Sequence, residues 1–169
     1  MRTIMPRLLF RDGLTAPLAA RMQTFWYNKK VKQEKRTSEG GWILKENTEK
    51  TFYEMIGGEE TIRKIVETFY PKVQADPLLA PLFPEDIRPV MEKQFMFLTQ
   101  FCGGPRLYSD TYGPPMMRAR HLPFEITKER ADAWLDCMQR TLEEIGMAPE
   151  LRELMMHKLR GPAYHFVNS

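Results

Sequence analysis

The chain has 169 residues, of which 43% are hydrophobic and 11% aromatic, and its formal net charge is +3. This length and apolar content suit one globular domain with a sizeable core. No stretch approaches the roughly 18 apolar residues needed to cross a bilayer, which argues against a membrane protein.

The charge is distributed unevenly along the chain. Residues 1–50 hold 11 Lys and Arg against 5 Asp and Glu, whereas residues 51–169 hold 14 against 17. The later region is mildly acidic, so we expect no nucleic-acid binding by the folded part. The basic run at 29–36 leads into Ser38-Glu39-Gly40-Gly41, a composition typical of a flexible segment. We therefore expect residues 1–50 to be a disordered extension and residues 51–169 to be the domain.

The N-terminal residues do not read as a secretory signal, because Arg11, Asp12 and Gly13 interrupt the apolar run before them. A transit peptide stays open as an alternative for the first 25 residues. Cys102 and Cys137 are the only cysteines, too few for a disulfide framework or a metal cage. Reduced, buried thiols in a cytoplasmic protein are the expectation.

The predicted elements are all helical. Thr51 and Glu54 have capping-box spacing, and Gly57-Gly58 ends that short turn. Apolar residues at helical spacing, with capping and stop signals, then predict helices over 59–73, 87–101, 116–121, 127–146 and 149–166. Pro71 is expected to kink the first of these, and Pro77, Pro81 and Pro84 to break the next segment into short turns. Residues 105–115 are predicted to form an irregular loop, and no segment alternates like a strand.

Three polar side chains fall on apolar helix faces. Gln94 lies within a stripe on the second long helix, Tyr70 lies at the edge of an apolar face, and Trp134 lies at the centre of another. Each alone is compatible with a core residue that bonds a nearby backbone group. Together they suggest a polar spot inside the domain. The stripe around Gln94 consists of Val90, Phe97, Leu98 and Phe101.

The chain has only three histidines. His157 points away from the apolar face of the last helix, whereas His165 lies at its edge and His121 ends a short helix before a proline. Zinc is poorly supported, since no second histidine or cysteine stands at ligand spacing. One histidine is sufficient for iron if a porphyrin supplies four ligands, but spacing does not choose between His121 and His165.

An ordered series of motifs from about Phe52 to Val167 resembles the truncated haemoglobins of the second group. Residues 1–50 lie outside the resemblance. Its features are Gly57-Gly58, Phe69-Tyr70, Pro77-Leu78 through Leu82-Phe83-Pro84, Gln94, Phe97-Leu98-Thr99-Gln100, Gly103-Gly104-Pro105, Arg118-Ala119-Arg120-His121-Leu122-Pro123-Phe124 and Arg130-Ala131-Asp132-Ala133-Trp134.

The resemblance implies a globin-like, two-over-two helical sandwich that holds haem b, with His121 as the proximal iron ligand. Tyr70, Gln94 and Trp134 match distal residues that hydrogen-bond bound dioxygen, and Phe83 matches a ring packed on the porphyrin. Val90 occupies a site where many globins place a polar residue, so it would leave ligand entry less obstructed. The further cofactor contacts it implies are Arg120, Lys93, Tyr108, Phe97, Leu98 and Met117, with the two cations facing the propionates.

The implied activity is binding of dioxygen and other small diatomic ligands, for oxygen handling, transport or storage. The alternative is a haem enzyme with peroxidase or nitric oxide dioxygenase activity, which a distal Tyr–Gln–Trp set could also serve. No catalytic residue is assigned. A sensor is disfavoured because no output domain follows from the sequence, and a homodimer stays open beside a monomer.

Overall fold

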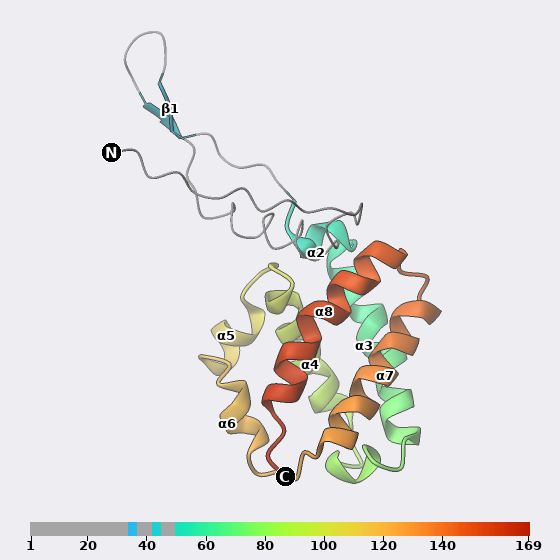
Figure 1. Ribbon diagram of the computed structural model, residues 1–169. Coiled ribbons are helices and arrows are strands. Elements are labelled where there is room, and N and C mark those ends of the chain that lie inside the picture. Colours follow the sequence, from blue (N-terminus) through green and yellow to red (C-terminus); the bar gives the residue numbers. More distant parts are fainter. Residues whose placement is uncertain (1–33, 37–41, 45–49) are drawn as a thin grey trace, which may run out of the picture. The chain divides into compact units, whose positions relative to one another are not determined.

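The computed structural model describes residues 34–36, 42–44 and 50–169 (Figure 1). The chain divides into two units, Met1–Glu49 and Lys50–Ser169. In the first unit, strands β1 (Glu34–Arg36) and β2 (Trp42–Leu44) pair antiparallel, with Glu34 opposite Leu44. The prediction missed this short pairing: aromatic and β-branched residues such as Trp42 and Ile43 favour extended backbone. The expected disorder of the rest of residues 1–50 lies outside the described residues.

The second unit is helical throughout, as predicted. Two long helix pairs make most of its contacts, α3 with α4 and α7 with α8, and α3 also packs on α7. Figure 1 shows α5 and α6 following α4 on one side of the unit. The elements are α2 (Phe52–Met55), α3 (Gly58–Ala75), the 3-10 turn η2 (Ala80–Leu82), α4 (Arg88–Phe101), α5 (Leu107–Tyr112), α6 (Met117–His121), α7 (Lys128–Glu144) and α8 (Pro149–His165).

Local signals set most of the helix boundaries. The capping box is present: the Thr51 backbone N–H donates to Glu54 Oε2 at 2.6 Å, and the Glu54 N–H donates to Thr51 Oγ1 at 3.2 Å. Thr127 caps α7 by accepting from the Arg130 N–H at 3.3 Å. Gly104 permits a close approach, because a Cβ there would lie 2.9 Å from the Thr99 carbonyl oxygen and from the Tyr53 ring. A side chain larger than glycine would therefore push the end of α4 away from α2.

One local prediction needs correction. Residues 105–115 are not an irregular loop throughout, because Leu107–Tyr112 form the six-residue helix α5. A helix of six residues is too short to show helical periodicity, so residue spacing did not predict it. Pro71 lies within α3, and the helix continues past it to Ala75. The kink expected there stays a prediction.

The core lies where the apolar faces of α3, α7 and α8 meet. On α3 the predicted stripe is buried in full, and on α7 four of its members are buried, while Trp134 and Ile145 are only half-buried. Among the described residues, no helix is both long and apolar enough to cross a membrane. The buried stripe members are Ile62, Val66, Phe69, Tyr70 and Val73 on α3 and Ala131, Leu135, Met138 and Leu142 on α7.

Helix α4 differs from the others in how its predicted stripe is covered. The residues that it buries against the protein are Phe95, Leu98 and Thr99. Most of the stripe around Gln94 is only half-buried, namely Val90, Gln94 itself, Phe97 and Phe101. An apolar face that the protein leaves partly uncovered has room for a further apolar group.

Candidate haem site

His121 ends α6, and its ring is held in one orientation. Its Nδ1 lies 2.6 Å from the carbonyl oxygen of Met117, one helical turn earlier. A carbonyl oxygen only accepts, so Nδ1 carries a proton, and in the neutral imidazole the free electron pair is then on Nε2. This is the form of imidazole that binds a metal, with the second nitrogen oriented by a hydrogen bond.

The other histidines lack this arrangement. His165 is exposed near the end of α8, where its backbone carbonyl accepts from Arg118 and its ring makes no hydrogen bond within residues 50–169. His157 is exposed as well. Within the described part of the chain, no three His, Cys, Asp or Glu side chains gather as they would in a metal cage. A metal at His121 would therefore need ligands from a cofactor, as a porphyrin provides.

The aromatic ring of Phe166 covers one face of His121. The two rings stack with centroids 4.2 Å apart and planes 7° from parallel. Sequence analysis identified Phe166 only as the last residue of a helix. Its contact joins positions 45 residues apart in the sequence, and local periodicity contains no information on such pairs.

Tyr70, Phe83 and Trp134 come together through Phe69 of α3. The Phe69 ring centroid lies 5.3 Å from that of Tyr70 and 5.2 Å from that of Trp134. Tyr70 in turn meets Phe83 edge-on at 6.0 Å. The cluster therefore draws on α3, α7 and the segment after η2. Among the described residues, no ring contact or hydrogen bond ties Gln94 or Val90 of α4 to this cluster.

The polar groups of this region have no protein partner. Within residues 50–169, the Tyr70 hydroxyl, the Gln94 amide and the Trp134 indole N–H make no hydrogen bond. Tyr70 is only 3% exposed, and this burial raises the pKa of its phenol above the usual value of 10, so that the group stays protonated. The structural alternative, that each bonds a nearby backbone group, therefore does not hold. Gln94 and Trp134 are half-buried, and within residues 50–169 the fully buried side-chain atoms that lack a partner are the hydroxyls of Thr99 and Thr141. The three donors are therefore open to an acceptor from outside the protein.

Helix α5 brings together the two cations expected at the propionates. The Lys93 ammonium lies 5.6 Å from the centre of the Tyr112 ring, and the Arg120 guanidinium 5.7 Å from that of Tyr108. The two tyrosine rings are 5.2 Å apart. Arg120 also donates to the carbonyl oxygens of Pro115 and Tyr112. Neither cation has a carboxylate partner within residues 50–169, so both are available to an anionic group.

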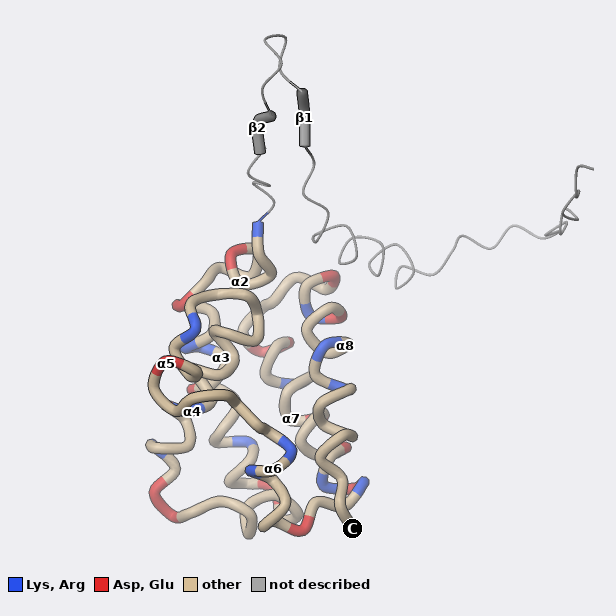
Figure 2. Tube along the Cα trace, turned by 90° about the vertical axis from the view of Figure 1, so that its left-hand side faces the viewer, with Lys and Arg blue, Asp and Glu red and all other residues tan. Residues whose placement is uncertain are grey.

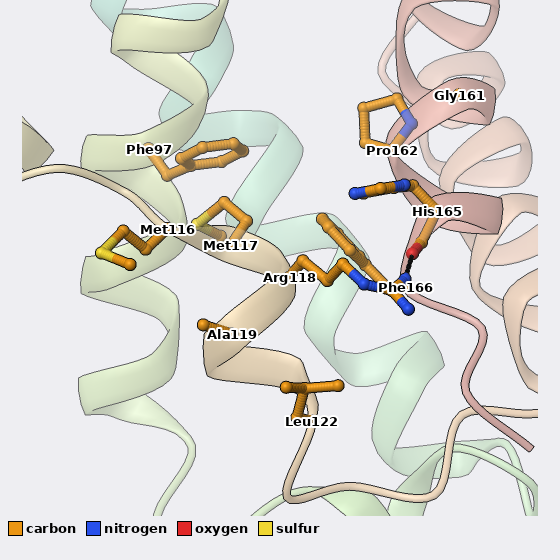
Figure 3. A pocket seen from close by; sticks show the side chains of 10 residues that line it. All are labelled: Phe97, Met116, Met117, Arg118, Ala119, Leu122, Gly161, Pro162, His165 and Phe166. Atoms are coloured by element: carbon orange, nitrogen blue, oxygen red, sulfur yellow. Dashed lines mark hydrogen bonds between the residues drawn. The ribbon is translucent and has the colours of Figure 1, made fainter.

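A pocket of about 840 Å³ lies between α4, α6 and the end of α8 (Figure 3). Its size lies within the range of about 300–1,000 Å³ typical of ligand sites. Two of the expected cofactor contacts, Phe97 and Met117, line it, whereas Leu98 is fully buried in the core. Phe166 also lines it, which places the pocket beside His121. The other lining residues are Met116, Arg118, Ala119, Leu122, Gly161, Pro162 and His165.

Comparison with known proteins defines the class of protein. The family model of the bacterial-like globins matches residues 51–168. The chain is 51% identical to the group 2 truncated haemoglobin YjbI of Bacillus subtilis over 116 residues, which is 69% of this chain and 87% of that protein.

Solved structures agree with this result. The group II truncated haemoglobin of Bacillus anthracis superposes with a TM-score of 0.71 at 46% identity, over 73% of this chain and 95% of that one. The truncated, oxygen-avid haemoglobin of Bacillus subtilis superposes with a TM-score of 0.68 at 50% identity, over 70% and 100%. The chain therefore belongs to the bacterial-like globins and, within them, to the group 2 truncated haemoglobins. Membership implies a haem cofactor and binding of small gaseous ligands such as oxygen.

Proposed function

We propose that the protein binds one haem b through His121 and stabilises dioxygen with donors from Tyr70, Gln94 and Trp134. Haem iron supplies reversible dioxygen binding and places partial negative charge on the ligand. The observation that carries the proposal is the combination of an oriented imidazole, whose Nε2 is free, with three donors that lack protein partners.

Each distal residue has a distinct role in this proposal. The buried Tyr70 phenol, kept protonated by its raised pKa, donates a hydrogen bond to the ligand. Trp134 and Gln94 add donors from α7 and α4. Phe69 packs against the rings of both Tyr70 and Trp134 and fixes their relative positions. Val90 offers no donor, so it leaves the path of ligand entry open rather than holding the ligand.

The remaining residues hold the cofactor. Lys93 and Arg120 have no carboxylate partners and stand beside the α5 tyrosines, so they suit the two propionates, with Tyr108 nearby. Phe83, Phe97 and Met117 supply apolar contact around the ring, and Leu98 packs in the core behind them. The partly uncovered face of α4 and the pocket beside His121 support this placement.

The cofactor is non-covalent haem b in this proposal. Covalent attachment of a c-type haem uses a C-x-x-C-H motif, and the two cysteines, Cys102 and Cys137, are separate and buried. The same free thiols suit a reducing compartment, and a cytoplasmic location is part of the proposal.

The test is a spectroscopic titration of the purified protein. We expect one haem per chain, extractable as iron protoporphyrin IX, and a ferrous form that binds and releases dioxygen reversibly. Autoxidation rate and peroxide turnover, measured on the same preparation, separate a carrier from a peroxidase, and sedimentation separates a monomer from a homodimer. A chain that fails to retain haem would contradict the proposal.

A further inference from the structure

The helix that carries His121 is not stabilised by its own sequence. Helix α6 has five residues, and none of them is buried. Its N-cap residue, Met116, has a φ of 41° and makes no side-chain capping bond. A single helical turn is unfavourable in isolation, because nucleation fixes several residues for one hydrogen bond. Contacts from elsewhere in the chain must therefore hold α6 in place. Figure 2 shows basic residues on α6 and no acidic ones.

Asn168, next to the end of the chain, supplies several of these contacts. Its side-chain Nδ2 donates to the carbonyl oxygen of Phe124 at 2.9 Å and to that of His121 at 3.4 Å. Its Oδ1 accepts from the Ile126 N–H at 3.0 Å, and its own backbone N–H donates to the Ile126 carbonyl oxygen at 3.0 Å. Asn168 thus forms hydrogen bonds with three backbone carbonyls and one backbone N–H, at the end of α6 and in the segment that follows it.

Two neighbours of Asn168 act on α6 in the same direction. The Phe166 ring stacks on the His121 ring. The carbonyl oxygen of His165 accepts a hydrogen bond from Arg118, which lies within α6 (Figure 3). We define residues 165–168 as the C-terminal clasp.

We propose that Asn168 is a positioning residue: through the His121 carbonyl and the segment after it, the C-terminal clasp fixes where the His121 imidazole presents Nε2. This proposal rests on the proposed function, because it assumes that His121 is the iron ligand. The Nδ1 bond to Met117 sets only the rotation of the ring about its own side chain. The clasp sets the position of the backbone from which the ring extends. Removing the clasp should let α6 fluctuate and should weaken retention of haem.

The test compares Asn168→Ala and Asn168→Asp with Ser169→Ala as the control. The aspartate keeps an acceptor for the Ile126 N–H but loses both donations from Nδ2. The control removes only the bond from Ser169 Oγ to Asn168 Oδ1. Three measurements are made: haem transfer to an excess of an acceptor apoprotein, the iron–histidine stretching band of the ferrous protein, and amide hydrogen exchange of Ile126 in the haem-free chain.

We expect Asn168→Ala and Asn168→Asp each to speed haem loss by about tenfold, equivalent to about 1.4 kcal/mol, and to shift the iron–histidine band. Exchange at Ile126 should rise in Asn168→Ala but stay slow in Asn168→Asp, since only the aspartate keeps the acceptor. Ser169→Ala should match the wild type in all three measurements.

Two results would overturn the proposal. One is haem loss within twofold of the wild type in both Asn168 variants. The other is faster amide exchange of Ile126 in Asn168→Ala with an unchanged iron–histidine band, which would make Asn168 merely structural. Failure of the proposed function looks different, because His121→Ala would then retain haem. If Asn168→Ala behaves like the wild type while His121→Ala loses haem, the clasp proposal fails and the proposed function stands.

Discussion

The two sides of the candidate haem site are built in different ways. On one side, Tyr70 and Trp134 extend from the long helices α3 and α7, and Phe69 between them is completely buried. On the other, His121 extends from the short helix α6, which buries none of its residues and depends on polar contacts to the C-terminal clasp. Apolar packing fixes the proposed hydrogen-bond donors, whereas directional bonds and one ring stack fix the proposed metal ligand.

The largest effect on haem binding is expected from replacing the proposed metal ligand. His121→Ala should lose haem, or retain it only with added imidazole, because among the histidines of residues 50–169 only His121 has a ring oriented by a hydrogen bond. His165→Ala is the matched control, since it removes the histidine that lines the pocket beside His121. The ratio of haem absorbance to protein absorbance after purification measures both. The reverse pattern would mean that the ligand is assigned to the wrong histidine.

The next largest effect concerns the distal donors. A hydrogen bond to a partly charged acceptor is worth about 1.5–3 kcal/mol, so Tyr70→Phe should raise the dioxygen off-rate by about 10-fold to 150-fold. Trp134→Phe should also speed dissociation, and the double variant should be less than additive because both groups share one ligand and one packing partner in Phe69. Stopped-flow measurement of dioxygen release checks all three.

The pH dependence of the dioxygen off-rate is a second test of Tyr70. Because burial raises the pKa of Tyr70 above 10, its phenol stays a donor at every lower pH, and the off-rate of the wild type should not change from about pH 6 to about pH 10 through this group. Association should change little in any of the variants. Off-rates within twofold of one another across the set would identify these side chains as ordinary core residues.

A smaller effect is expected at the edge of the site. Lys93→Gln removes one of the two cations proposed to pair with the propionates. An exposed ion pair contributes about 0.2–1 kcal/mol. Haem loss should therefore accelerate by about 1.4-fold to fivefold. Lys64→Gln is the control, because Lys64 pairs with Glu60 on the exposed face of α3. Equal rates for the two variants would remove Lys93 from the cofactor site.

The smallest effect is expected from the N-terminal segment. A chain that begins at Lys45 should fold, bind haem and show unchanged oxygen affinity, since residues 1–45 lie outside the family match. Differential scanning calorimetry measures the outcome. A domain of this size loses about 2–8 °C per kcal/mol, so a midpoint lower by more than a few degrees would show that the segment packs on the domain.

Residue spacing singled out the proposed distal donors, but it did not single out the proposed proximal ligand. Helical spacing alone placed Tyr70, Gln94 and Trp134 on apolar faces. The capping signal at Thr51 marked the start of the domain, and the one at Thr127 marked the start of α7. Spacing did not distinguish His121 from His165, and only the resemblance did so.

The rest of the proximal side escaped prediction for a physical reason. Contacts such as those of Asn168 with His121 and Phe124 join residues more than 40 positions apart, and they use a side chain that is exposed and polar. Neither periodicity nor composition marks such a residue. Helix α5 was missed because its six residues are too few to show a period.

The contact of Trp134 with Phe69 has an optical consequence. Of the three tryptophans in the chain, Trp26 and Trp42 precede Lys45, so Trp134 is the single indole in a chain that begins there. Its emission would come from a fluorophore fixed on the wall of the proposed haem site. Since haem absorbs strongly at the wavelengths where indoles emit, bound cofactor would quench that emission by energy transfer. Loading and loss of haem could then be followed by intrinsic fluorescence, without any added label.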